Sequence, residues 1–166
     1  MQKMVLSLLA DNNSGVLSRI SGLFSRRGYN IESITAGVTA DPKYSRITIV
    51  TCGDEEIIDQ IEKQVAKLED VRDVKELPIE SSVHRELCMI KVRTASAERE
   101  NIVSLAGIFR GNIIDVASDS VIVEITGNQS KIDAFIGLLD GYEILEVART
   151  GIAGLSRGSE NVTYLP

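Results

Sequence analysis

The chain has 166 residues, a formal net charge of −6, 43% hydrophobic residues and 25% charged residues. This length accommodates one ordinary domain or two small ones, and the composition is that of a globular protein with a hydrophobic core. Residues 1–80 carry 10 basic and 13 acidic residues and residues 81–166 carry 8 and 11, so neither half has the basic surface of a nucleic-acid-binding module.

The first half alternates between strand-like runs and two amphipathic helices. The apolar residues of the first helix recur on one face, at Val16, Leu17, Ile20, Leu23 and Phe24. Asn13 or Ser14 can cap this helix and Gly28 can end it, and Asp54 can cap a second helix over residues 54–68. Strands are predicted at residues 4–9, 30–38, 44–52 and 71–77. The order of elements is therefore βαββαβ.

The second half repeats this order after a polar, irregular segment that follows Pro78. Strands are predicted at residues 85–93, 112–117, 120–126 and 142–149, and helices at residues 97–109 and 130–139. Ser130 and Asp133 resemble a capping box, with Asn128 as the alternative cap. The segments LFSRRGYNI and IFRGNI both pass from a helix through Arg and Gly into a strand that opens with Asn-Ile, which supports an internal repeat.

Each half has the order of a ferredoxin-like fold, an α+β arrangement in which right-handed crossovers place both helices on one face of an antiparallel sheet. The predicted organisation is a first domain over residues 1–78, a second over 82–158 and a tail over 159–166. The other face of each sheet is expected to be uncovered. Because domains of this size bury little surface alone, packing against a second copy is expected.

Residues typical of catalysis are scarce. The single histidine, His84, follows the segment between the halves and is interpreted as a surface or strand-edge residue. No HExxH, GxSxG, Walker A or GxGxxG motif is present, and no metal-binding cluster is predicted. Cys52 and Cys88 lie in strand-like runs and are interpreted as buried free thiols of a reducing compartment. The N-terminal apolar run is too short for a signal or membrane segment, so we expect a cytoplasmic protein that is not an enzyme.

The turn ADNNSG, residues 10–15, leads directly into the first helix. The first N–H groups of a helix lack partners within it and favour an anion such as a carboxylate. Gly15 permits close approach to the backbone, and the amides of Asn12, Asn13 and Asn30 can bind a carboxylate or an ammonium group. The turn therefore suits a free amino acid, although helix capping alone also favours these residue types.

The segment DNNSGVLSRISGLFSRRGYNIESITAG resembles the opening of ACT domains. A longer match includes DPKYSRITIV, IEKQVAKLEDV, FRGNIIDV and EVARTGIAGLSRG, and it resembles the regulatory small subunit of acetohydroxyacid synthase, also called acetolactate synthase. The resemblance extends from about Met4 to Gly158, and RGYNIES and GLSRG are specific to that family. It implies that the first domain is an ACT domain.

The resemblance also implies a function. The chain would be a non-catalytic subunit that activates a large catalytic subunit and makes it sensitive to feedback by valine, or by leucine or isoleucine. Thiamin diphosphate, Mg and FAD would be bound by the large subunit and none by this chain. The alternatives are the effector domain of an amino-acid-responsive transcription regulator, which would need a helix-turn-helix and a basic surface, and an enzyme with an ACT-like appendage, for which the two repeats leave no room.

The resemblance further implies a binding site between the ACT domains of two chains. The matching effector-binding positions are Asn12, Gly15, Val16, Leu17, Asn30 and Ile31. The second half has RTASAERE where the first has its Asn-Asn-Ser-Gly turn, so no second pocket of this design is expected. The resemblance makes Arg149 and Arg157 candidates for contact with the catalytic subunit, with a frayed tail as the alternative for the residues after Gly158.

Overall fold

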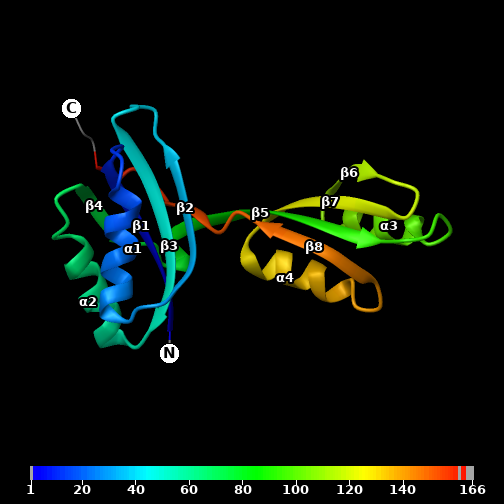
Figure 1. Cartoon of the computed structure of the whole chain (residues 1–166), viewed down its shortest axis with the longest axis horizontal. Coiled ribbons are helices and arrows are strands. Elements are labelled where there is room, and N and C mark those ends of the chain that lie inside the picture. The colour runs from blue at the N-terminus through cyan, green and yellow to red at the C-terminus, as the bar shows by residue number, and fades with distance from the viewer. Residues whose placement is uncertain (1, 161, 164–166) are drawn as a thin grey trace. The chain divides into compact units, whose positions relative to one another are not determined.

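The computed structural model describes residues 2–160, 162 and 163. The chain forms two compact units: residues up to His84 together with those from Ile152 onward form the first, and residues Arg85 to Gly151 form the second. Each unit has a sheet with two helices (Figure 1). The predicted α+β class, with two ferredoxin-like repeats in tandem, is confirmed.

The first unit has the predicted βαββαβ order. Its elements are β1 (Gln2–Asp11), α1 (Val16–Arg27), β2 (Ile31–Val38), β3 (Tyr44–Gly53), α2 (Glu55–Val65) and β4 (Val71–Glu76). The strands form an antiparallel sheet in the order β2-β3-β1-β4, which leaves β2 and β4 at its edges. Helices α1 and α2 lie side by side on one face of this sheet (Figure 1).

The core of the first unit lies between the sheet and these helices. Its fully buried residues include Leu6 and Leu8 of β1, Ile20 and Phe24 of α1, and Ile49 of β3. Burying each of these side chains stabilises the folded state by about 1.5 to 3 kcal/mol. The alternating residues of the strands and the apolar stripe of the helix place them on the faces that meet in the core.

The ends of the two helices test the predicted caps. Gly28 ends α1 in the left-handed conformation at φ 71°, as predicted. Asp54 caps α2, since its Oδ1 accepts a hydrogen bond of 3.0 Å from the Ile57 N–H, also as predicted. Helix α2 ends at Val65, three residues before its predicted end.

The second face of the first sheet is partly covered, contrary to the expectation of a bare face. Val5 and Val50 point away from the helices and are buried with Leu77 and Ile152 in a small apolar cluster. Ile152 follows the second unit in the sequence and leads into β9 (Ala153–Ser156), which pairs with β5. The C-terminal segment therefore supplies part of the layer that the repeat itself lacks.

The second unit repeats the topology. After a short 3₁₀ helix at Ile79–Ser81, its elements are β5 (Ser82–Arg93), α3 (Arg99–Ile108), β6 (Asn112–Val116), β7 (Ser120–Gly127), α4 (Gln129–Leu138) and β8 (Glu143–Arg149). The strand order is β6-β7-β5-β8. Asn128, the alternative candidate, caps α4 by accepting a 2.9 Å hydrogen bond from the Lys131 N–H, so the Ser130 capping box is not formed.

The core of the second unit centres on Phe135, which contacts Phe109 edge-on at 5.4 Å between ring centroids. The opposite face of this sheet carries the ion pair between Lys91 and Glu146, and Met89 there is 39% exposed. Among the described residues, these side chains on the second face are exposed.

The compact units and the predicted domains differ at their boundaries. Residues 82–84 and 152–158, which we predicted in the second domain, group with the first unit. The physical reason is the burial of Ile152 against Val5 and Val50. Of the predicted tail, residues 161 and 164–166 lie outside the described residues, and Thr163 donates a 2.8 Å hydrogen bond to the Asp73 carboxylate of β4.

Candidate functional site

The β1–α1 turn, residues 12–15, begins helix α1 without a capping side chain. Gly15 is the N-cap residue, in the left-handed conformation at φ 86° and ψ −6°, and no side chain accepts a hydrogen bond from the first turn. The expected caps, Asn13 and Ser14, are therefore wrong. Because Gly15 occupies the N-cap position itself, Asn13 and Ser14 lie two residues and one residue before the position from which a side chain reaches the first N–H groups.

The start of α1 is electrostatically incomplete. Its first turn contains no acidic residue. Helix α2, by contrast, has its Asp54 cap and two glutamates in its first turn, Glu55 and Glu56. The unpaired N–H groups of a helix start carry a partial positive charge, which acidic residues usually offset. The start of α1 is therefore suited to an external anion.

Asn12, a predicted effector-binding residue, supports the turn from the side. Its Nδ2 donates to the Pro42 carbonyl at 2.9 Å, and its Oδ1 accepts from the Ser45 hydroxyl at 3.2 Å. Its backbone N–H donates to the Lys43 carbonyl at 2.7 Å. These contacts attach the turn to the β2–β3 hairpin, so the amide of Asn12 positions the turn.

The next two predicted residues differ in exposure. Val16 is 4% exposed and belongs to the core, where it anchors the first turn of α1. Leu17 is 48% exposed and offers an apolar surface beside the start of the helix.

Two ion pairs, which the sequence analysis did not predict, surround the same turn. Asp11, directly before it, accepts two hydrogen bonds from Arg72, one of them 2.7 Å long from Nε. These bonds hold the pKa of the Asp11 carboxyl below its usual value. Arg19 Nε donates to the Asp70 carboxylate at 2.6 Å, and the Asp70 carbonyl accepts from the Asp11 N–H at 2.8 Å. The partners are more than 50 residues apart in sequence, and no local pattern signals them.

The remaining two predicted residues lie at the beginning of β2. Asn30 is exposed and directly precedes the strand, and its carbonyl accepts a 2.5 Å hydrogen bond from the Thr51 hydroxyl. Ile31 lies opposite Thr51 in the sheet and packs, half-buried, against the core.

The sheet register separates Asn30 from the β1–α1 turn. Asp11, next to the turn, lies opposite Tyr44 at the start of β3, whereas Ile31 lies opposite Thr51 near the end of β3. These seven positions correspond to about 23 Å along a strand at about 3.3 Å per residue. Within one chain, the six predicted residues therefore form two groups at opposite ends of α1.

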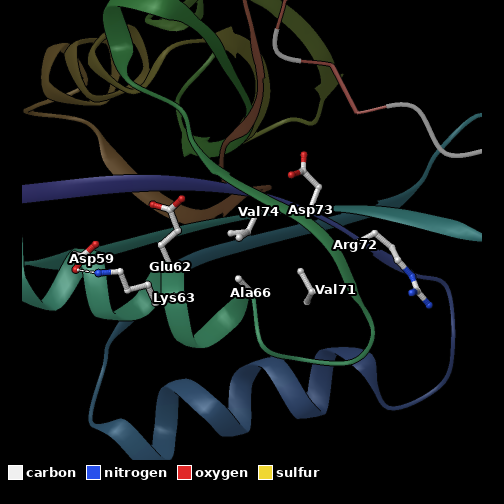
Figure 2. Close-up of a pocket in the computed structure, with 8 residues that line it drawn as sticks. All are labelled: Asp59, Glu62, Lys63, Ala66, Val71, Arg72, Asp73 and Val74. Atoms are coloured by element: carbon white, nitrogen blue, oxygen red, sulfur yellow. Dashed lines mark hydrogen bonds and ion pairs between the residues drawn. The ribbon is translucent and has the colours of Figure 1, made fainter.

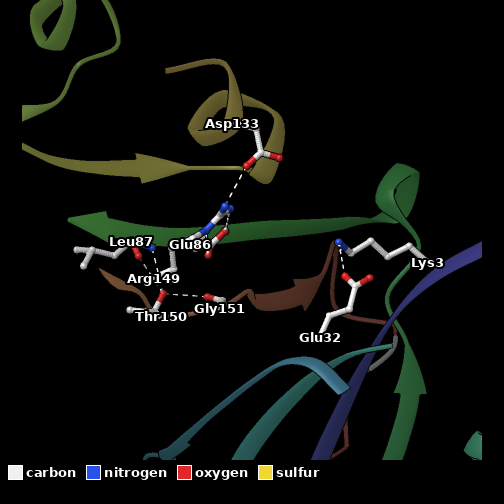
Figure 3. A network of polar contacts seen from close by, with 8 residues as sticks. All are labelled: Lys3, Glu32, Glu86, Leu87, Asp133, Arg149, Thr150 and Gly151. Carbon is white, nitrogen blue, oxygen red and sulfur yellow. Dashed lines mark hydrogen bonds and ion pairs between the residues drawn. The ribbon is translucent and has the colours of Figure 1, made fainter. Parts of the chain in front are cut away.

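The predicted partner-contact residue Arg149 is engaged inside the second unit (Figure 3). Its Nε and Nη2 donate to the two carboxylate oxygens of Glu86 at 2.8 and 2.9 Å, and its Nη1 donates to Asp133 at 3.0 Å. The bonds to Glu86 raise the pKa of Arg149. Arg157 is exposed, and its backbone N–H donates to the Ser81 carbonyl at 2.8 Å.

A cavity of about 460 Å³ lies between α2 and β4, away from the predicted residues (Figure 2). It is lined by Asp59, Glu62, Lys63, Ala66, Val71, Arg72, Asp73 and Val74. Burial raises the pKa of Glu62, and the charges of Glu76 and Asp59 add to this effect. The lining is mainly charged and of both signs.

Possible nucleophiles are held in internal contacts. Ser82 is 4% exposed, and its hydroxyl lies 2.8 Å from His84 Nε2 but donates its proton to the Pro78 carbonyl. It is therefore not arranged as an activated serine. Cys88 is a buried free thiol as predicted.

Cys52 is a free thiol as predicted, but it is half-buried where we predicted a buried residue. It donates a hydrogen bond of 2.9 Å to Glu32, which raises the pKa of the thiol. Lys3 forms a 2.6 Å ion pair with the same carboxylate (Figure 3). Across the described part of the chain, no group of His, Cys, Asp and Glu could hold a metal ion, and no helix is long and apolar enough to cross a membrane.

Comparison with known proteins gives matches over both units. A family model described as the AHAS small subunit-like ACT domain matches residues 6–73, and one described as the small subunit of acetolactate synthase matches residues 85–158. The probable acetolactate synthase small subunit of Methanothermobacter thermautotrophicus is 47% identical over 159 residues, which cover 95% of each chain. The chain belongs to the acetolactate synthase small subunit family.

Other members of the acetolactate synthase small subunit family are equally similar. The isozyme 3 small subunit of Escherichia coli is 48% identical over 157 residues, which cover 94% of this chain and 96% of that one. The crystal structure of the acetolactate synthase small subunit from Thermotoga maritima matches with a TM-score of 0.88 at 43% identity, covering 96% of this chain and 99% of that one. The resemblance drawn from the sequence is confirmed.

Proposed function

We propose that this chain is the regulatory subunit of an acetolactate synthase. It performs no chemistry itself, raises the activity of a large catalytic subunit in the cytoplasm, and makes that subunit sensitive to inhibition by valine. Thiamin diphosphate, magnesium and FAD are, in this proposal, held by the large subunit. Membership of the small subunit family supports the pairing with a catalytic partner.

The observation that carries the regulatory part of the proposal is the uncapped start of α1 at Gly15. Its N–H groups and partial positive charge suit the carboxylate of an amino acid. The amide of Asn30, exposed at the start of β2, suits the ammonium group, because its oxygen can accept from that group. The two halves of the ligand therefore match the two groups of predicted residues.

The distance of about 23 Å between these groups along a strand excludes a single small ligand bridging them within one chain. In a dimer of two copies related by a two-fold axis, one group from each copy can lie close together. In the described part of the chain, β3 is the one strand that pairs with edge strand β2. Antiparallel pairing of β2 with its counterpart in a second copy would bring the start of one β2 beside the end of the other. The Asn30 end of one copy would then lie beside the Gly15 end of its partner.

Exposed apolar side chains near this edge support pairing of two copies. Ile34 and Val38 of β2 are 39% and 60% exposed, and Leu17 of α1 is 48% exposed. Val38 lies opposite Ser45, at the end of the sheet nearest the β1–α1 turn. Burial of these residues would stabilise a dimer, and Val38 and Leu17 would contact the aliphatic side chain of a branched amino acid.

Valine bound between two copies would favour one arrangement of the paired units over another, and the attached catalytic subunit would respond to that arrangement. A coupling free energy of about 1 to 3 kcal/mol gives a several-fold to hundredfold change in activity or affinity.

Reconstitution tests this function. The purified chain alone should form no acetolactate from pyruvate, and adding it to the cognate large subunit should raise the rate and introduce inhibition by valine. Gly15→Asp should keep activation and lose inhibition, and Ser25→Ala, an exposed change elsewhere on α1, should retain both. The absence of any effect on the large subunit would refute the proposal.

A further inference from the structure

The guanidinium group of Arg19 lies against the open side of Gly15. A Cβ atom placed on Gly15 would be 2.9 Å from Arg19 Nη1 and 3.9 Å from Nη2. The Arg19 side chain thus folds back along α1 to Gly15, the N-cap residue of the helix. Arg19 therefore places further cationic N–H donors beside a helix start that already carries a partial positive charge, although the Asp70 carboxylate offsets part of the arginine charge.

Asp70 holds Arg19 in this position through one nitrogen. The Nε–H donates to the Asp70 carboxylate at 2.6 Å, and that carboxylate is 18% exposed. No partner for Nη1 or Nη2 is found among the described residues. The donors of the guanidinium end therefore stay available while its position is fixed.

The neighbouring ion pair between Arg72 and Asp11 differs from the pair between Arg19 and Asp70. Arg72 donates to both carboxylate oxygens of Asp11, through Nε and Nη2, in the side-by-side geometry of a complete arginine–carboxylate pair. Arg72 is thus matched by its internal partner, whereas Arg19 uses only Nε. Two arginines beside the same turn therefore have different capacities for an external carboxylate.

We infer that Arg19 is a binding residue that contacts the carboxylate of the effector, an inference that rests on the proposed effector site. The helix N–H groups approach the carboxylate from one side and the Nη groups of Arg19 from another. Hydrogen bonds between charged groups are shorter and stronger than neutral ones, so this contact makes a free carboxylate a requirement for tight binding. Asp70 is a positioning residue that acts through Arg19.

A ligand change tests this inference without altering the protein. Valinamide keeps the ammonium group and the side chain of valine and lacks its carboxylate charge. Calorimetry on the full-length wild-type chain should show valinamide binding about 10- to 100-fold more weakly than valine, the range expected for a charged hydrogen bond. Equal affinity for the two ligands would overturn the inference.

Four variants test whether Arg19 causes the preference for valine over valinamide. Arg19→Met should reduce valine affinity by about 10- to 100-fold and remove the preference over valinamide, with an unchanged dimer mass by light scattering. Arg72→Met is the matched control and should keep the preference. Asp70→Asn should have an intermediate effect, since it removes the charge of the partner and leaves only a neutral acceptor for the Arg19 Nε–H. If Arg19→Met fails to fold, Arg19→Lys should retain part of the preference, because it keeps the charge and loses the guanidinium geometry that points Nη1 and Nη2 away from Asp70.

The outcomes separate this inference from the function on which it rests. If Arg19→Met binds valine as the wild type does while Gly15→Asp does not, the effector site stands and the role of Arg19 is refuted. If the wild type binds no valine, the proposed effector site itself fails. The valine affinity of the wild type should fall as salt is added, and that of Arg19→Met should not change with salt. This pair of results would support the contact between Arg19 and the valine carboxylate.

Discussion

Arg149 and Glu86 should contribute unequally to the stability of the second unit. The Glu86 side chain is 5% exposed, and both of its carboxylate oxygens accept from Arg149. Arg149→Met removes these donors and leaves a buried charge without its partner, at a cost of about 3 to 5 kcal/mol. Glu86→Gln leaves Arg149, whose side chain is 30% exposed, with Asp133 and water, at a cost of about 1 to 2 kcal/mol.

These costs are large enough to measure. For a unit of this size, each kcal/mol lowers the unfolding temperature by about 4 to 8 °C, so Arg149→Met should lower it by more than 10 °C. Hydrogen exchange followed by mass spectrometry on the full chain would localise the loss to β5 and β8.

The exposed pair between Lys91 and Glu146 provides the control. Its side chains are 37% and 73% exposed, so Lys91→Met should cost less than about 1 kcal/mol. Equal small effects for Arg149→Met and Lys91→Met would refute the claim that the Arg149 network stabilises the unit.

Substitutions at three further positions test other parts of the structure. Gly15→Asp should abolish valine binding, and Gly15→Asn, which has the same shape and also tolerates the left-handed conformation, should weaken it less in calorimetry. Glu62→Gln should raise the melting temperature at pH 7, because the raised pKa means that the ionised carboxylate destabilises the fold; the gain should vanish in melts below that pKa, and a gain that is independent of pH would contradict the assignment. Ile152→Ala should cost about 2 to 4 kcal/mol and increase hydrogen exchange in β1, whereas unchanged exchange there would show that the C-terminal segment does not support the first unit.

Local periodicity predicted the βαββαβ order of each half, but not β9 at Ala153–Ser156. Alternating residues such as Leu6 and Leu8 in β1 and the stripe containing Ile20 and Phe24 in α1 are patterns in which sequence spacing alone determines the buried face. The caps at Asp54 and Gly28 were predictable for the same reason, since each depends on the immediate neighbours.

Contacts between distant segments were not predictable in this way. The burial of Ile152 under the first sheet depends on a segment that returns after the whole second unit. The pairs of Arg19 with Asp70 and of Arg72 with Asp11 join residues 51 and 61 positions apart. Their charges resemble an ordinary solvated surface until the fold brings them together.

The candidate site was predictable only in part from the sequence. The sequence pattern pointed to the turn at Gly15 but predicted a side-chain cap, because Asn and Ser before a helix usually serve as caps. Family resemblance named Asn30 as well, and only the sheet register shows that it lies at the other end of α1.

The central claim is that the effector site is shared between two copies of the chain, and subunit mixing tests it most directly. Gly15→Asp and Asn30→Ala should each abolish valine binding in a pure dimer. After the two variants are mixed in equal amounts and allowed to reassort, half of the dimers contain both, and each of these has one site with neither change. Calorimetry should then recover about a quarter of the wild-type binding capacity. No recovery, in a mixture shown by mass spectrometry to contain the mixed dimer, would contradict a shared site.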